Sequence, residues 1–136
     1  MTLQLNPYLS FRDNAREAME FYHSVFGGDL TISTFAEFQA SQSPDEDNLV
    51  MHSALTVPGG IALMASDTPR RIAYTPGNDV SLSFNGNDAE TLHRYWDGLS
   101  EGATITQPLV AAQWGDDFGM LTDKFGVAWL FSIAAS

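Results

Sequence analysis

The sequence contains no cysteine, which excludes a disulfide framework, a thiolate metal site and a cysteine nucleophile. It is also poor in basic residues, with 6 Lys and Arg against 17 Asp and Glu, so its formal net charge is −11 at pH 7. A field of that sign repels phosphate groups, so we expect neither a nucleic acid nor a membrane as partner. The same field favours neutral or cationic small molecules over anionic ones.

Long hydrophobic runs are missing as well. The longest mostly apolar stretch, Val127–Ala135, is shorter than the roughly 20 residues that a membrane-spanning helix needs. No apolar segment follows the first basic residue, Arg12, as it would in a signal peptide. We therefore expect a cytoplasmic protein. With 136 residues, 44% of them hydrophobic and only 6 prolines and 11 glycines, the composition is typical of one globular domain.

The most informative feature is an internal repeat. When the sequence is aligned with itself so that residues 9–11 (Leu-Ser-Phe) match residues 82–84, further identities follow in order. They are Asn14 with Asn87, Glu17 with Glu90, Tyr22 with Tyr95, and Thr31-Ile32 with Thr104-Ile105. A slightly shorter shift matches the later parts, because the first copy has a longer loop at Gln39–Asn48. The repeat predicts two modules, 1–68 and 79–136, joined by a linker at 69–78 within a single domain 1–136.

Each module is predicted to be a βαβββ unit. The helices carry apolar residues at helical spacing, and Asn14 with Glu17, like Asn87 with Glu90, matches the pattern of a capping box. The predicted strands are Tyr8–Phe11, Thr31–Phe38, Leu49–Val57 and Ile61–Ser66 in the first module, and Val80–Phe84, Ala103–Val110, Phe118–Thr122 and Val127–Ile133 in the second.

Strand alternation separates two faces of these sheets. One face collects large apolar residues and is expected to pack under the helices. The other mixes small, hydroxyl and a few apolar side chains, and by parity it includes His52. A curved sheet lined in this way can enclose a small ligand. The alternative is that this face is buried against a second copy of the chain.

Tandem βαβββ modules with Phe21-Tyr22 in the first helix and Gly27-Gly28 after it resemble the vicinal oxygen chelate superfamily. That superfamily includes glyoxalase I, extradiol dioxygenases and bleomycin-resistance proteins. Residues 7–11, 64–67 and 121–129 are similar to its PhnB-like branch, often labelled 3-demethylubiquinone 3-methyltransferase. The resemblance implies an α+β fold, with tandem βαβββ modules forming a curved mixed sheet around a cavity. It also implies a homodimer.

The resemblance further implies where a metal would bind. Metal-dependent members hold a divalent ion with His and Glu from the first and last strands of the modules, ligands that suit Zn, Ni, Fe or Mn. The matching positions here are Pro7 (or Asn6), Met64, Asp79 and Leu130, of which only Asp79 is a good ligand. We therefore expect no cofactor, and a divalent metal only without the usual ligands. No Gly-rich strand–turn–helix loop for a nucleotide-like cofactor is present either.

His52 is the candidate catalytic residue, as a general base near neutral pH; the alternative is a histidine that only bonds a neighbour. Its counterpart in the second module is Phe118, which predicts a pocket with a polar and an aromatic end. Trp114 is expected at the lip or in the core, and Asp67 in a surface turn beside Arg70 or Arg71. The candidate ligand-binding residues are Tyr8, Ser10, Met64, Asp67, Ser81, Ser83, Trp114, Phe118 and Met120.

These observations predict a PhnB-like protein of unassigned reaction that binds a small organic molecule. Two alternatives stay open. The first is a glyoxalase-type lyase or isomerase, or a dioxygenase-type enzyme, that uses His52 with a weakly bound metal. The second is a module whose open face serves dimerisation without catalysis.

Overall fold

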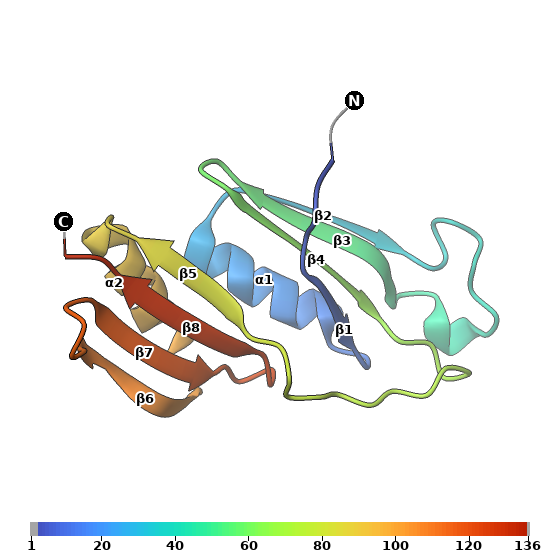
Figure 1. Ribbon diagram of the computed structural model, residues 1–136. Coiled ribbons are helices and arrows are strands. Elements are labelled where there is room, and N and C mark those ends of the chain that lie inside the picture. The colour runs from blue at the N-terminus through green and yellow to red at the C-terminus, as the bar shows by residue number, and fades with distance from the viewer. Residues whose placement is uncertain (1–2, 136) are drawn as a thin grey trace. The chain divides into compact units, whose positions relative to one another are not determined.

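The computed structural model describes residues 3–135, and the chain divides between Pro76 and Gly77 into two compact units (Figure 1). Each unit holds one long helix and a four-stranded mixed sheet. The α+β class predicted from the sequence is confirmed. The packing of the modules into a single domain with a 69–78 linker stays a prediction.

The first unit has the predicted βαβββ order with one short added helix. Its elements are β1 (Tyr8–Phe11), α1 (Ala15–Phe26), β2 (Asp29–Thr34), the 3-10 turn η1 (Pro44–Glu46), β3 (Val50–Val57) and β4 (Ile61–Asp67). The spatial strand order is β1-β4-β3-β2. β1 runs parallel to β4, and the other neighbours are antiparallel.

The second unit repeats this topology. Its elements are β5 (Leu82–Gly86), α2 (Ala89–Leu99), β6 (Thr104–Ala111), β7 (Asp117–Thr122) and β8 (Ala128–Ile133), in the spatial order β5-β8-β7-β6. β5 is again the strand that runs parallel to its neighbour. The shared topology is what a duplicated module would produce.

The register shows where the two copies differ. Leu30 lies opposite Leu55 in the first sheet, as Ile105 lies opposite Leu121 in the second. Leu30 therefore corresponds to Ile105, whereas the sequence shift matched it with Ala103. The correspondence shifts because the segment between the helix and the next strand is longer in the second unit. It consists of residues 27–28 between α1 and β2, and of residues 100–103 between α2 and β6.

In each unit the helix covers one face of the sheet. The buried side of α1 consists of Ala15, Ala18, Met19, Tyr22 and Phe26, and it packs on β2, β3 and β4. In the second unit, the ring of Trp96 on α2 meets Phe131 edge-on at 5.3 Å between centroids. Burying these aromatic and aliphatic side chains is the main stabilising contribution to each unit.

Most strand boundaries lie within one residue of the sequence prediction, but two strands differ by more. The second strand ends at Thr34 rather than Phe38, because Thr34 and Glu37 bond each other reciprocally: the Thr34 amide donates to Glu37 Oε1, and the Glu37 amide donates to Thr34 Oγ1. The fifth strand spans Leu82–Gly86 rather than Val80–Phe84, so Ser81 precedes it and is exposed.

Both predicted capping boxes are wrong. Asn14 occupies the N-cap position of α1 but makes no side-chain cap bond. In α2 the cap is Asp88, one residue after Asn87, and its carboxylate accepts the Thr91 amide at 3.2 Å. Asp88 is the better acceptor because a carboxylate at a helix N-terminus also interacts favourably with the helix dipole.

Candidate functional site

The structure brings Tyr8 and His52 together, two of the site residues predicted from the sequence. Tyr8 begins β1 and His52 lies in β3, with β4 between them. The Tyr8 hydroxyl lies 3.3 Å from Nδ1 of His52, and the two ring centroids are 5.9 Å apart. Tyr8 is 49% exposed and His52 is half-buried, so the pair is accessible from outside the sheet.

The register shows which residues share this face. Tyr8 lies opposite Met64, which lies opposite Ala54. Ser10 is paired with Ser66, and His52 with Ser33. Ser53 and Leu55, which alternate with His52 and Ala54, are completely buried on the helix side. The open face around the Tyr8–His52 pair is therefore lined by Met64, alanine and serine side chains. Ser33 was not among the predicted residues. Its place in the strand that pairs with the strand of His52 is the signal that could have indicated it.

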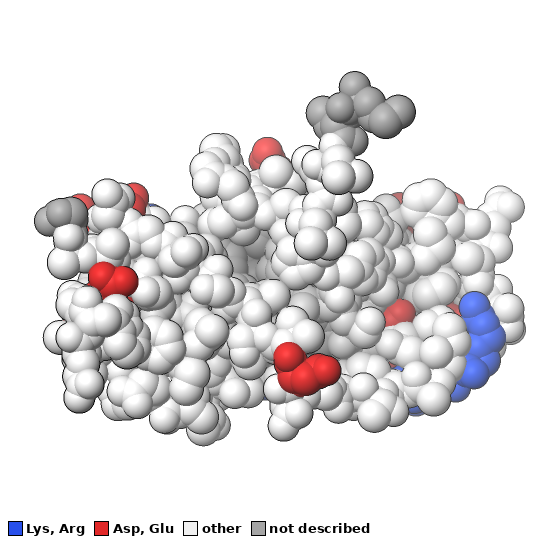
Figure 2. All heavy atoms as spheres, in the orientation of Figure 1, with Lys and Arg blue, Asp and Glu red and all other residues white. Residues whose placement is uncertain are grey.

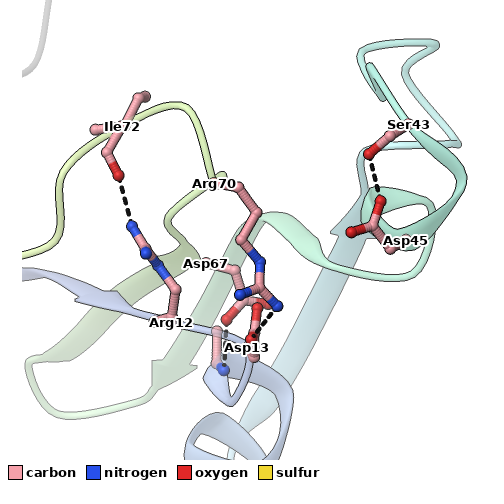
Figure 3. A network of polar contacts seen from close by, with 8 residues as sticks. Arg12, Asp13, Ser43, Asp45, Asp67, Arg70 and Ile72 are labelled. Carbon is pink, nitrogen blue, oxygen red and sulfur yellow. Dashed lines mark hydrogen bonds and ion pairs between the residues drawn. The ribbon is translucent and has the colours of Figure 1, made fainter.

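Asp67 is not in a surface turn, and this prediction is wrong. It is the last residue of β4, it is only 4% exposed, and its carboxylate accepts two backbone amides. Oδ1 accepts the Ala15 amide at 2.9 Å and Oδ2 accepts the Val50 amide at 2.9 Å. Asp67 thus caps α1, although it lies 52 positions from Ala15 in the sequence, and it anchors the start of β3; Figure 3 shows the helix end.

The arginines near Asp67 have other partners. Arg70 donates to Asp13 at 2.7 Å, and Arg71 lies 4.0 Å from Glu46, which is buried in η1. Arg12 donates to the carbonyl oxygen of Ile72 at 2.5 Å (Figure 3). The predicted pairing of Asp67 with Arg70 or Arg71 is therefore wrong, because both carboxylate oxygens already accept backbone amides.

A second group of predicted site residues lies on the sheet of the second unit. The ring of Trp114 meets Phe118 at 5.5 Å between centroids with a 67° tilt. Trp114 is 65% exposed, so it does not belong to the core. Met120, on the same side of β7 as Phe118, lies opposite Leu130, and Leu130 lies opposite Ser83. Ser81 lies outside the strand, two residues before Ser83.

Asp116 is a residue of this face that the sequence prediction missed. Ser132 lies opposite Phe118 in the register, and its hydroxyl donates to Asp116 Oδ2 at 3.4 Å. Asp117 is directed to the other side, where its carboxylate lies 3.7 Å from His93 Nε2 on α2. Asp116 lies two residues before Phe118, so the alternation of side chains along a strand could have placed it on this face from the sequence.

The residues present do not fit the metal site that the superfamily resemblance implies. Pro7 and Leu130 carry no donor, and Met64 offers only a thioether, a poor ligand for hard cations. Within residues 3–135 no three His, Asp or Glu side chains gather as a metal site would require. The loops that lead into α1 and α2, residues 12–14 and 87–88, hold no glycine, so they do not fit a phosphate-cradling cofactor loop either.

Charged side chains are unevenly distributed on the face that Figure 2 shows. In the view of Figure 2, acidic side chains form separate small patches, and most of the visible surface is uncharged. The basic side chains visible in this view lie at the edge where η1 and the segment after β4 are found. None of the described helices is both long and apolar enough to cross a membrane.

A family model described as 3-demethylubiquinone-9 3-methyltransferase matches residues 4–132. The chain belongs to this family. Protein PA1353 from Pseudomonas aeruginosa is 38% identical with a TM-score of 0.82, covering 98% of both chains. A putative 3-demethylubiquinone-9 3-methyltransferase, PhnB protein, from Bacillus cereus is 27% identical with a TM-score of 0.73, covering 97% of this chain and 100% of the other.

A more distant structure extends the relationship at the level of the fold. A glyoxalase/bleomycin resistance protein/dioxygenase family enzyme from Burkholderia phytofirmans is 16% identical with a TM-score of 0.61, covering 93% of this chain and 94% of that one. Together with the family match, this likeness confirms that the chain is a PhnB-like protein with the vicinal oxygen chelate fold. The family name describes a methyl transfer, but the family match by itself assigns no reaction to this chain.

Proposed function

We propose that this PhnB-like protein binds a small, oxygen-bearing organic molecule on the open face of its first sheet, and that Tyr8 and His52 hold it. The observation that carries the proposal is the contact between the Tyr8 hydroxyl and His52 Nδ1 on an accessible, mostly uncharged face.

The chemistry of the pair supports an oxygen-bearing ligand. A hydroxyl can donate or accept, and so can a neutral imidazole, depending on its tautomer. With Nδ1 turned to Tyr8, the opposite ring nitrogen, Nε2, is the one that can reach a ligand. The pair therefore matches a ligand carbonyl or hydroxyl oxygen, while Met64 and the neighbouring small side chains provide apolar contact. At a net charge of −11, the surrounding field disfavours anionic ligands.

The proposal is tested by calorimetric titration with a panel of fragment-sized ketones, phenols and amides. We expect Tyr8→Phe, which removes only the hydroxyl, to weaken binding about five- to tenfold, the usual effect of losing one hydrogen bond. Tyr74→Phe is the matched control, because it makes the same change at another tyrosine of the same unit. Equal affinities for the two variants, or no binding by any compound of the panel, would overturn the proposal.

A second candidate is a lyase or isomerase reaction in which His52 acts as general base. The same contact favours it, because a hydrogen-bonded hydroxyl orients the imidazole and can relay a proton. Replacement of His52 by Gln should then abolish turnover of a bound compound, whereas His93→Gln, on α2, should not. Binding without turnover by the wild-type protein would leave only the first proposal.

Two wider expectations accompany this function. We propose a homodimer, because the open face of the sheet is suited to a second copy as well as to a ligand, and light scattering would show a monomer if this is wrong. We also propose a cytoplasmic protein, which fractionation of cells would test.

A further inference from the structure

We propose that the open face of the second sheet carries a site for a small organic cation, formed by Trp114, Phe118 and the carboxylate of Asp116. This inference concerns a different unit from the Tyr8–His52 pair and does not depend on it.

Trp114 and Phe118 form the aromatic part of the proposed site. Trp114 lies in the loop between β6 and β7, and its ring meets Phe118 at 5.5 Å in an edge-on arrangement. A side chain as large as tryptophan is usually buried, yet Trp114 is 65% exposed. Val110, opposite Phe118 in the register, is also 52% exposed. The result is an accessible aromatic corner on this face.

The loop holds Trp114 in place. The amide of Ala112 donates to the carbonyl oxygen of Asp116 at 2.8 Å, and the amide of Gly115 donates to the carbonyl oxygen of Ala112 at 3.1 Å. Gly115 has a φ of 104°, a left-handed conformation that favours glycine at this turn. These bonds fix the backbone around Trp114, which reduces the entropy that the loop would lose on contact with a ligand.

The carboxylate of Asp116 supplies the negative charge of the proposed site. Asp116 is half-buried, and its Oδ2 accepts the hydroxyl of Ser132, the residue opposite Phe118. The negative charge is therefore held on the same face as the two rings. Asp117, by contrast, lies near His93 on the helix side and does not contribute to this face.

The combination selects a cation with an apolar body. Aromatic faces attract cations through the ring quadrupole, tryptophan most strongly, and they favour alkylated ammonium groups that are easy to desolvate. A carboxylate beside the rings adds direct attraction. A neutral ligand of the same shape would gain only the apolar contact. An anion would be repelled by Asp116 and by the net charge of the chain.

The test compares choline with 3,3-dimethylbutan-1-ol, which has the same shape but no charge, at low ionic strength. The probe signal is the indole NMR resonance of Trp114, assigned by its loss in Trp114→Leu. The indoles of Trp96 and Trp129, which are 8% and 4% exposed, report that the fold is unchanged. We expect choline to shift the Trp114 signal and to bind about three- to tenfold more tightly than the alcohol.

Two variants sharpen the comparison. Asp116→Asn should weaken choline binding about threefold or more and leave the alcohol unaffected. Asp97→Asn makes the same charge change at an exposed position on α2, so it controls for the loss of net charge. Equal binding of the two probes would overturn the inference, and so would equal effects of the two variants or choline shifts that spare Trp114. If Asp116→Asn disturbs the buried indoles, calorimetric titration of Trp114→Leu with both probes decides instead: the inference requires that this variant no longer prefers choline over the alcohol, and an unchanged preference would overturn it.

Discussion

Replacing Asp67 by asparagine should destabilise the first unit more than any other single change of a carboxylate to an amide in that unit. The Asp67 side chain is 4% exposed and accepts the amides of Ala15 and Val50, both at 2.9 Å. An asparagine keeps one acceptor oxygen but turns an NH2 group toward the other amide. One buried donor then loses its partner.

The magnitude follows from these contacts. A buried donor left without an acceptor costs about 1–3 kcal/mol, and loss of a negative charge at the N-terminus of α1 adds about 0.3–1 kcal/mol. We therefore expect Asp67→Asn to lower the free energy of unfolding by about 2–3 kcal/mol. Asp67→Ala, which removes both acceptors, should lower it by about 3–5 kcal/mol. Either value is a large part of the total stability of a small protein, which is about 5–15 kcal/mol.

The assay is urea unfolding followed by far-ultraviolet circular dichroism, combined with amide hydrogen exchange. Tryptophan fluorescence is unsuitable, because all three tryptophans, Trp96, Trp114 and Trp129, lie in the second unit. Asp29→Asn, at the exposed start of β2, is the matched control and should change stability by less than about 0.5 kcal/mol. The capping role is refuted if Asp67→Asn is as stable as Asp29→Asn. It is also refuted if the Ala15 and Val50 amides exchange as slowly in Asp67→Asn as in the wild type.

Two further predictions concern packing and charge. Gly119→Ala should destabilise the second unit by about 1–3 kcal/mol, because its new Cβ would lie 2.8 Å from the Trp96 ring, whereas Gly77→Ala would meet only a side-chain oxygen at 3.6 Å; equal melting temperatures for the two variants would contradict this. The Ser43 hydroxyl bonds the Asp45 carboxylate and lowers its pKa below 3.8. Ser43→Ala should therefore raise the pKa of Asp45 toward 3.8 in an NMR titration. A carboxyl group whose pKa is lower in the folded than in the unfolded state stabilises the fold at pH values above its unfolded-state pKa, and this stabilisation is lost as the pH falls through the folded-state pKa. The stability difference between the wild type and Ser43→Ala should therefore disappear in the acid range below 3.8. An unchanged pKa of Asp45 in the variant would refute the role of the hydroxyl.

The fold could be predicted from the sequence where the signal was periodic and local. The strand over Tyr8–Phe11 matches the structure residue for residue, and the helix expected between Asn14 and Gly27 spans Ala15–Phe26. Alternation also placed His52 correctly on the face away from the buried Ser53 and Leu55. These features depend on side-chain spacing within one element, which the sequence displays directly.

The errors arose where the deciding contact is distant in the chain or depends on side-chain chemistry. The cap of α1 comes from Asp67, 52 positions from the amide that it accepts, so no local motif could reveal it. The early end of β2 results from a reciprocal bond between Thr34 and Glu37, which competes with the strand ladder. The contact between Tyr8 and His52 likewise required the strand order, because β4 separates their strands.

The central claim is that a small organic molecule binds beside Tyr8 and His52. The most direct measurement is two-dimensional NMR of the His52 ring during titration with the best-binding ketone, phenol or amide of the panel. We predict that the His52 ring signals shift with the ligand, while those of His23 and His93 on the two helices stay in place. Saturable binding that leaves the His52 signals unchanged would contradict the account.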